Sequence, residues 1–190
     1  MNLNKREDIS VHTLRKKQKT DAMMLGLMIT LAVTLATTTA VIIPSALAQN
    51  PPICSDENAT LVGTSGDDNI VGTTGREVIA ALEGNHRVQA LSEGDLVCGS
   101  DGDDWLDGGE GNDLLNGGAG NNLMSGGAGD DVIQGGADND VFQDGPGDDE
   151  MFGGAGDDFI DGGAGIDSAD GGPGFDTCVN VENAINCEAW

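Results

Sequence analysis

Aromatic residues and positive charges are scarce in this chain of 190 residues. It has no Tyr, four Phe and two Trp, which excludes an ordinary aromatic-rich core. Lys and Arg number 8 against 33 Asp and Glu. From residue 49 onward the chain holds 30 acids, which is 33 minus the three before that point, and only Arg76 and Arg87 as bases. Nucleic acid is therefore excluded as a partner, and the segment is expected to stay disordered unless cations neutralise it.

The sequence also lacks the constellation of a catalytic centre. His86 is the one histidine after residue 49, and neither a nucleophile elbow nor a second metal ligand accompanies it. Zinc, which prefers clusters of His or Cys, is not indicated. We predict that the protein is not an enzyme and has no small-molecule substrate. His86 is interpreted as a substitution at a repeated position rather than as a catalytic base.

The N-terminal segment predicts export. Residues 1–21 are polar and basic, residues 22–43 are apolar, and Ala46-Leu47-Ala48 has the small-x-small form of a signal peptidase site. Residues 1–48 are therefore predicted to be a signal peptide with a hydrophobic helix. The alternative is an uncleaved anchor, because about 20 apolar residues suffice to span a bilayer. The protein is then secreted and extracellular, or it lies on the outer face of the membrane.

A period of nine residues runs without interruption from Gly63 to Val179, and thirteen units fit, among them GGEGNDLLN and GGAGDDFID. Positions 1, 2 and 4 are mostly Gly, which suits backbone at positive φ. Position 8 is the predicted core, with Ile70, Ile79, Val88, Val97, Leu106, Leu115, Met124, Ile133, Phe142, Met151, Ile160, Ala169 and Cys178. Position 6 is the predicted ligand column, with Asp68, Glu77, His86, Asp95, Asp104, Asp113, Asn122, Asp131, Asp140, Asp149, Asp158, Asp167 and Asp176.

These units resemble the calcium-binding nonapeptide G-G-x-G-x-D-x-U-x of RTX proteins, where U is a large apolar residue. The resemblance implies an all-β fold, a parallel β-roll or β-solenoid. Six residues of each unit would form a calcium-binding turn and three a short strand, so that two units complete one coil. Many RTX proteins attach such repeats to a toxin, protease or lipase. This sequence looks instead like the small stand-alone calcium-binding repeat proteins.

Stacked coils would bring equivalent acids, 18 residues apart, to one edge of the roll. At a coil spacing of about 4.8 Å, neighbouring charges repel by on the order of 3 kcal/mol per pair at an effective dielectric of 20. Such a ladder needs cations. Several Ca²⁺ ions are predicted, because calcium accepts six to eight oxygens in loose geometry whereas magnesium demands tight octahedra. EF-hand loops are excluded, because their spacing of ligands does not occur.

The strength of the calcium sites is expected to vary along the roll. Units starting at residues 72, 81 and 90 depart most from the pattern, so residues 72–98 are predicted to fold with weak or absent calcium binding. The strongest predicted ligands are Asp104, Asp113, Asp131, Asp140, Asp149, Asp158, Asp167 and Asp176, and the weaker ones are Asp68, Asp95 and Asn122. Backbone carbonyls are expected to contribute around Gly109, Gly111, Gly127, Gly129, Gly154, Gly156, Gly163 and Gly165.

Four cysteines, Cys54, Cys98, Cys178 and Cys187, follow the predicted signal, and an even count in an exported chain indicates disulfides. Of the three possible pairings we favour Cys54–Cys98 and Cys178–Cys187, because each would close one end of the roll. Solenoids need such ends. Residues 49–62 and 180–190 are the predicted N-terminal and C-terminal caps around a roll at residues 63–179.

Two functions of different classes fit these observations. The first is an extracellular calcium-binding protein whose roll folds as Ca²⁺ binds. The alternative is a structural or adhesive protein of the cell surface or matrix, which uses the calcium-filled roll as a rigid spacer. The sequence identifies no protein or cell-surface partner.

Overall fold

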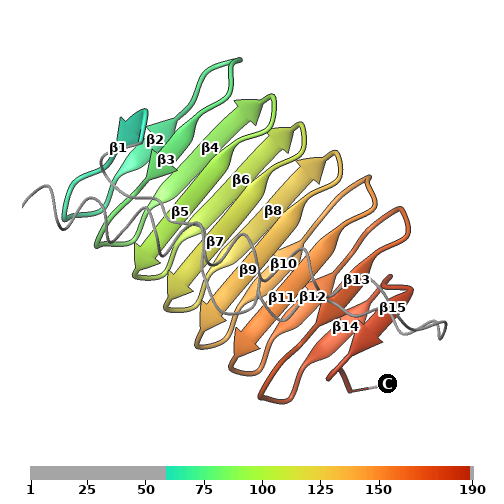
Figure 1. Ribbon diagram of the computed structural model, residues 1–190. Coiled ribbons are helices and arrows are strands. Elements are labelled where there is room, and N and C mark those ends of the chain that lie inside the picture. The colour runs from blue at the N-terminus through green and yellow to red at the C-terminus, as the bar shows by residue number, and fades with distance from the viewer. Residues whose placement is uncertain (1–58, 189–190) are drawn as a thin grey trace, which may run out of the picture. The chain divides into compact units, whose positions relative to one another are not determined.

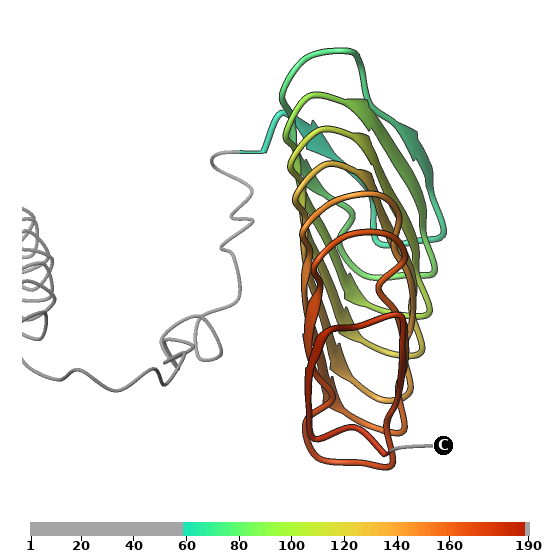
Figure 2. The ribbon, with the colours of Figure 1, turned by 90° about the vertical axis from the view of Figure 1, so that its right-hand side faces the viewer.

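The computed structural model describes residues 59–188, which form a parallel β-solenoid of two facing sheets (Figures 1 and 2). Successive strands alternate between the sheets, so odd-numbered strands belong to one sheet and even-numbered strands to the other. This confirms the predicted all-β parallel β-roll. Within the described residues no helix is long and apolar enough to cross a membrane. The predicted signal peptide or anchor at 1–48 lies outside the described residues.

The strands are short and regular. The eight-stranded sheet contains β1 (Leu61–Val62), β3 (Val78–Ala80), β5 (Leu96–Asp101), β7 (Leu114–Ala119), β9 (Val132–Ala137), β11 (Glu150–Ala155), β13 (Ser168–Asp170) and β15 (Asn183–Ile185). The seven-stranded sheet contains β2 (Asn69–Val71), β4 (Arg87–Ser92), β6 (Trp105–Glu110), β8 (Leu123–Ala128), β10 (Val141–Gln143), β12 (Phe159–Asp161) and β14 (Thr177–Val179). Strands this short are stable only when stacked on neighbours.

The register between strands equals two units of the repeat. Leu114 pairs with Val132 and Leu115 with Ile133, an offset of 18 residues. This confirms that two nonapeptides complete one coil. Figure 2 shows the coils as flattened loops with a sheet along each long side. At the C-terminal end the offset shortens, because Ser168 of β13 pairs with Asn183 of β15, after the repeat has ended.

The core is the single column that the repeat predicts. Ile79, Val88, Val97, Leu106, Leu115, Met124, Ile133, Phe142, Met151 and Ile160 are completely buried between the sheets, and Ala169 is 3% exposed. Ile70 and Cys178, near the two ends, are partly buried and pack against this column. Alternation along a strand points position 8 inward and positions 7 and 9 outward. Trp105, at position 7, therefore lies on the outside, where the Arg87 guanidinium stacks 3.2 Å from the centre of its ring.

Glycine at position 2 permits the close approach of neighbouring coils. Gly127 has φ +109°, and a Cβ at this residue would lie 2.1 Å from the carbonyl oxygen of Gly109 in the adjacent coil. Only glycine adopts this backbone without strain. Three other residues, Leu82, Leu91 and Ser100, take positive φ at the same repeat position without being glycine. They lie in the coils of the roll that depart most from the consensus.

The segments expected to be caps also contribute strands. β1 lies in the segment 49–62, and β15 lies in the segment 180–190. Val181 packs against the core column, whereas Ile185 remains 46% exposed. Each added strand extends a sheet by one member and covers part of the terminal coil.

Candidate metal-binding edges

The position 6 side chains lie along two edges of the roll, where the chain turns from one sheet to the other. We call the edge that precedes the eight-stranded sheet the first edge; it carries Glu77, Asp95, Asp113, Asp131, Asp149 and Asp167. The second edge precedes the seven-stranded sheet and carries Asp68, His86, Asp104, Asn122, Asp140, Asp158 and Asp176. All of them except Asp68 are at most 7% exposed. A row of acids is thus buried on each edge, although acids are rarely buried without a partner.

One oxygen of each ladder carboxylate is used to hold the next coil. The backbone N–H of Asp113 donates to Oδ1 of Asp131 at 2.7 Å, and the N–H of Asp131 donates to Oδ1 of Asp149 at 2.8 Å. The same bond recurs every 18 residues on the second edge, for example from Asp140 to Asp158 at 2.8 Å. These bonds orient each carboxylate and fix the coil spacing. They account for only one of its two oxygens.

The other oxygen has no hydrogen-bond partner in the described part of the chain. This holds for Oδ2 of nine ladder residues, which are Asp95, Asp104, Asp113, Asp131, Asp140, Asp149, Asp158, Asp167 and Asp176. A buried carboxylate oxygen without a partner is strongly unfavourable unless a cation neutralises it. The donor set, carboxylates beside peptide carbonyls, is the one that calcium prefers. The residues therefore fit calcium.

Glycine at position 1 leaves the space that each free oxygen faces. A Cβ on Gly108 would lie 2.3 Å from Oδ2 of Asp113 and 2.6 Å from the carbonyl oxygen of Gly126. A Cβ on Gly153 would meet Oδ2 of Asp158 at 2.4 Å in the same way. Each turn thus keeps a small space between a carboxylate and a carbonyl of the following coil. An ion that coordinates both oxygens would join two coils.

The eight glycines predicted to lend carbonyls all lie on the two edges. Gly109, Gly111, Gly127, Gly129, Gly163 and Gly165 belong to first-edge units, and Gly154 and Gly156 belong to a second-edge unit. The carbonyls of Gly129 and Gly156 come nearest to the ladder. A Cβ on Gly147 would lie close to both the Gly129 carbonyl and Oδ1 of Asp149, and a Cβ on Gly174 would lie close to both the Gly156 carbonyl and Oδ1 of Asp176.

The first coils satisfy their ladder groups with protein atoms instead. Thr64 donates its N–H and hydroxyl to Asp68 at 2.6 and 2.9 Å, and Thr73 donates likewise to Glu77. Nδ1 of His86 accepts the N–H of Asp68 at 3.2 Å, so the proton lies on Nε2, which donates to the Leu82 carbonyl at 3.2 Å. An imidazole N–H thus reaches a turn carbonyl of its own unit. No cation is needed for that contact.

Asn122 is arranged in a similar way. Its Oδ1 accepts the N–H of Asp104 at 3.0 Å, and its Nδ2 donates to the carbonyl of Gly120 at 3.1 Å. The amide oxygen is therefore engaged in the ladder, and the amide nitrogen faces the turn. An N–H₂ group there contacts the carbonyl that a cation would otherwise attract.

The electrostatics distinguish the two kinds of coil. Burial raises the pKa of Asp113 to about 6, that of Asp140 to about 7 and that of Asp131 to about 8, because removing water disfavours the charged form. Neighbouring carboxylates of the ladder raise these pKa values further. By contrast, the hydrogen bond from the Thr64 backbone lowers the pKa of Asp68. The ladder from Asp95 onward thus strongly favours neutralisation of its charge, whether by protons or by cations.

Sequence reasoning missed a second ladder, formed by position 5 on the outside of the turns. The N–H of Asp103 donates to Oδ1 of Asn85 at 2.8 Å, and the N–H of Asn121 donates to Oδ1 of Asp103 at 2.8 Å. These bonds run in the opposite direction along the roll from those of position 6. The available signal was the frequent Asp or Asn at position 5. Such side chains accept hydrogen bonds from turn backbones.

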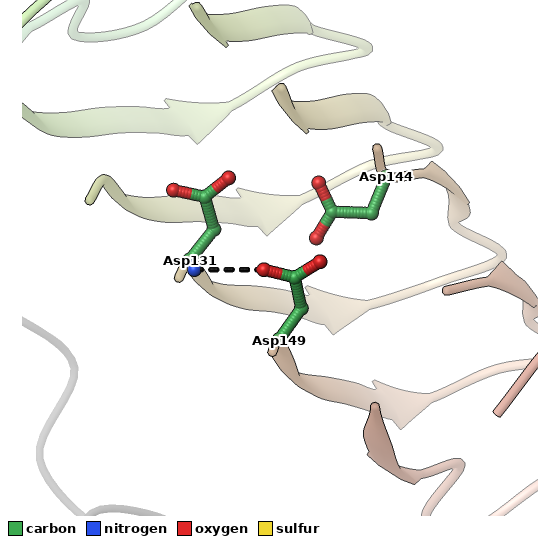
Figure 3. Close-up of side chains that lie close together, drawn as sticks. All are labelled: Asp131, Asp144 and Asp149. Carbon is green, nitrogen blue, oxygen red and sulfur yellow. Dashed lines mark hydrogen bonds between the residues drawn. The ribbon is translucent and has the colours of Figure 1, made fainter. Parts of the chain in front are cut away.

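Three more acids join the ladders outside the predicted column. Oε2 of Glu182 accepts the N–H of Asp167 at 2.8 Å, and Oε2 of Glu188 accepts the N–H of Asp176, so the C-terminal segment ends each ladder with a glutamate. Asp144, at position 1 of its unit, lies beside Asp131 and Asp149 (Figure 3). The signal for Asp144 was an acid at a position where the other units have Gly or Ala.

The two favoured cysteine pairings differ in what the structure describes. Cys178 on β14 and Cys187 are joined, with 5.8 Å between their Cα atoms, a separation typical of disulfides. This bond links the last strand of the seven-stranded sheet to the C-terminal segment. The pairing of Cys98 with Cys54 involves a residue outside the described part of the chain.

Comparison with known proteins agrees with this geometry. The family model of the RTX calcium-binding nonapeptide repeat (HemolysinCabind) matches residues 55–85, 99–133, 117–143, 134–169 and 143–178. Together these ranges cover more than half of the chain, and the gap at 86–98 falls in the units that depart most from the consensus. No curated protein matches the chain. The repeats, the parallel roll and the buried acidic ladders are those of a calcium-binding domain, and the chain belongs to the RTX calcium-binding nonapeptide repeat family.

Proposed function

We propose that the chain is an exported calcium-binding protein whose β-roll folds when Ca²⁺ fills its two edges. The observation that carries the proposal is the set of nine buried ladder carboxylates, from Asp95 to Asp176, whose second oxygen has no partner. In the ion-free state each of these oxygens opposes folding. Calcium bound between a carboxylate and the carbonyls of the adjacent coil removes that opposition and joins the coils.

Calcium is proposed to occupy the coils unevenly. The ligands are Asp104, Asp113, Asp131, Asp140, Asp149, Asp158, Asp167 and Asp176, with carbonyls of the neighbouring turns. The internal partners of Asp68, Glu77, His86 and Asn122 support weak or absent binding at those positions. Asp95 belongs to a weak site, because Arg76 acts electrostatically on its carboxylate and opposes the rise of its pKa.

Export is the part of the proposal that gives the calcium dependence a purpose. Extracellular calcium modules bind at about 10⁻⁴ to 10⁻³ M, so such a roll stays unfolded inside a cell and folds outside it. Residues 1–48 would direct export, and the caps at 49–62 and 180–190 would carry the disulfides Cys54–Cys98 and Cys178–Cys187. The roll itself belongs to a structural, non-catalytic repeat family, and we propose no enzymatic activity.

The test is circular dichroism of the full-length chain titrated with Ca²⁺ and, separately, with Mg²⁺. We expect a transition from coil to β-structure with calcium at concentrations where magnesium has little effect, because the carbonyl-rich turns do not offer a tight octahedron. Asp149→Asn should shift the calcium midpoint upward. The matched control is Glu83→Gln, which removes one charge from an exposed side chain at the other end of the roll.

Two outcomes would contradict the proposal. If the chain has the same β-structure with and without calcium, folding is not coupled to the ion. If calorimetry at saturating calcium detects no bound ion, the chain does not bind calcium through these edges. The Glu83→Gln control separates a site effect from a general change of net charge.

A calcium-rigidified structural or adhesive surface protein is the second candidate. The outer face of the seven-stranded sheet favours it, because large apolar side chains occupy position 7 on consecutive strands: Trp105, Leu123, Val141 and Phe159. The last three are 36–37% exposed, and exposed apolar rows often mark contact surfaces. Retention of residues 22–43 in cell membranes would support this candidate. Recovery of a shortened chain in the medium would favour the first.

A further inference from the structure

Asp144 occupies a place in the roll that other units leave empty. It stands at position 1 of its unit, directly after β10, where the remaining units have Gly or Ala. Its side chain lies over Gly126 of the preceding first-edge coil. A Cβ on Gly126 would be 2.6 Å from Oδ1 of Asp144 and 2.3 Å from Oδ2 of Asp131. The absence of a side chain at Gly126 therefore admits a third carboxylate to this turn.

Backbone hydrogen bonds hold the Asp144 carboxylate in this orientation. Its Oδ1 accepts the N–H of Gly127 at 3.1 Å and the N–H of Gly145 at 3.0 Å. Its Oδ2 has no partner among the described residues. One oxygen therefore anchors the side chain to two adjacent coils, and the other is left free to coordinate an ion.

The free oxygens of three acids converge at this point. Ligand atoms of Asp131, Asp144 and Asp149 all lie within 4.8 Å of one another, and Figure 3 shows the three carboxylates facing a common space. Asp131 and Asp149 are 1% and 2% exposed, and each has an unpartnered Oδ2. In the part of the chain that the structure describes, no other three acids approach this closely. The cluster is thus buried and unsatisfied, unlike acids that merely gather on a surface.

No positively charged side chain can neutralise this cluster. Among residues 59–188 the basic residues Arg76 and Arg87 both lie in the first coils of the roll, several coils away from Asp144. Three carboxylates in a dry turn must therefore attract a cation from solution. Among oxygen-ligated calcium sites, affinity rises with the number of charged ligands and with the rigidity of the site.

We propose that Asp131, Asp144 and Asp149 form a three-carboxylate calcium site that releases its ion more slowly than the other sites of the roll. This inference rests on the proposed calcium binding and adds a specific high-affinity position to it. Asp131 and Asp149 supply the ladder oxygens of two stacked coils. Asp144 supplies a third charged ligand that the consensus repeat lacks.

The experiment measures calcium release from the loaded full-length chain after rapid mixing with a chromophoric chelator. Affinity differences between related sites reside mostly in the dissociation rate. Wild type should show a slow phase with the amplitude of one ion. Asp144→Asn and Asp144→Gly should accelerate that phase about tenfold or more, while Glu83→Gln leaves it unchanged. Asp144→Gly restores the consensus glycine, and circular dichroism at saturating calcium verifies that each variant is folded.

The outcomes separate this inference from the proposed function. If wild type releases all of its calcium in one phase, or if the slow phase survives in both folded Asp144 variants, the three-carboxylate site is refuted while calcium binding by the roll stands. If the loaded chain releases no calcium at all, the proposed function itself fails. A slow phase that disappears in both Asp144 variants and persists in Glu83→Gln supports the inference.

Discussion

At the scale of single residues, each repeat position has one physical role, and departures from the consensus reveal it. His86 and Asn122 stand in the ligand column but donate N–H groups to the turn carbonyls of Leu82 and Gly120. The same position therefore either demands a cation or replaces it with a protein donor. A sequence can mark the substitution, but the replacement contact depends on the geometry of the turn.

Glycine at position 2 provides a prediction at this scale. Gly127→Ala should destabilise the calcium-loaded roll by about 1–3 kcal/mol, because alanine at φ +109° is strained and its Cβ would lie 2.1 Å from the Gly109 carbonyl oxygen. Urea unfolding at saturating calcium measures the change. The matched control is Gly66→Ala, whose Cβ would meet no atom closer than 4.0 Å. Equal effects of the two substitutions would refute the steric argument.

At the scale of elements, a strand of three to six residues contributes one inward side chain and depends on its neighbours for stability. β10 illustrates this, because it pairs with β8 on one side and β12 on the other and inserts only Phe142 into the core. The whole interior is a single column, so each of its members contacts the members above and below. Loss of one member should weaken several coils together.

Two phenylalanines on adjacent strands test this view. Phe142→Ala should reduce the free energy of unfolding of the calcium-loaded roll by about 3–5 kcal/mol, the usual effect of removing a fully buried aromatic side chain. Phe159→Ala on β12 is the matched control, because that side chain points outward and is 37% exposed, so its effect should be much smaller. Denaturant unfolding at saturating calcium measures both. A larger effect at Phe159 would mean that the outer face is buried by something else.

At the scale of the whole molecule, electrostatics governs stability more than core size does. The segment from residue 49 carries 30 acids against two arginines, and its ladder acids are buried. Folding without ions therefore concentrates negative charge in a medium that solvates it poorly. Calcium and protons are two ways to relieve the same strain, and they should act in opposite pH ranges.

This competition yields a prediction about pH. In the ion-free chain the pKa values of Asp113, Asp140, Asp144 and Asp131 rise to between about 6 and about 8, above the ordinary 3.8 of the unfolded chain. The folded state then binds more protons, so stability should fall as pH rises from about 4 to about 8. Circular dichroism of metal-free protein should show more β-structure at pH 5 than at pH 8.

With calcium present the trend should reverse, because protons compete with the ion for the same carboxylates. Loaded protein is expected to be less stable at pH 5 than at pH 8. A metal-free chain that gains structure as pH rises would contradict the assignment of the ladder acids as the groups that oppose folding. The loaded and metal-free series, measured side by side, distinguish this effect from a general acid sensitivity.

Much of the fold and the acidic column follows from the sequence alone. The nine-residue period requires that every unit meet the same environment, so position 8 had to be the interior and position 6 one face of each turn. Both positions are buried as predicted, and the offset of 18 residues confirms two units per coil. Repetition makes such inference reliable because each column is read many times over.

Only the tertiary structure decided the contacts that break the period. Asp144 reaches Asp131 over Gly126, Glu182 and Glu188 end the two ladders, and Thr64 and Thr73 satisfy the first acids. None of these pairs is related by the 18-residue register, so no periodic pattern predicts them. Each depends on where a side chain projects once neighbouring coils are stacked. The sequence by itself thus determined the repeating architecture and its acidic edges, whereas stacking decided which oxygens remain free to bind an ion.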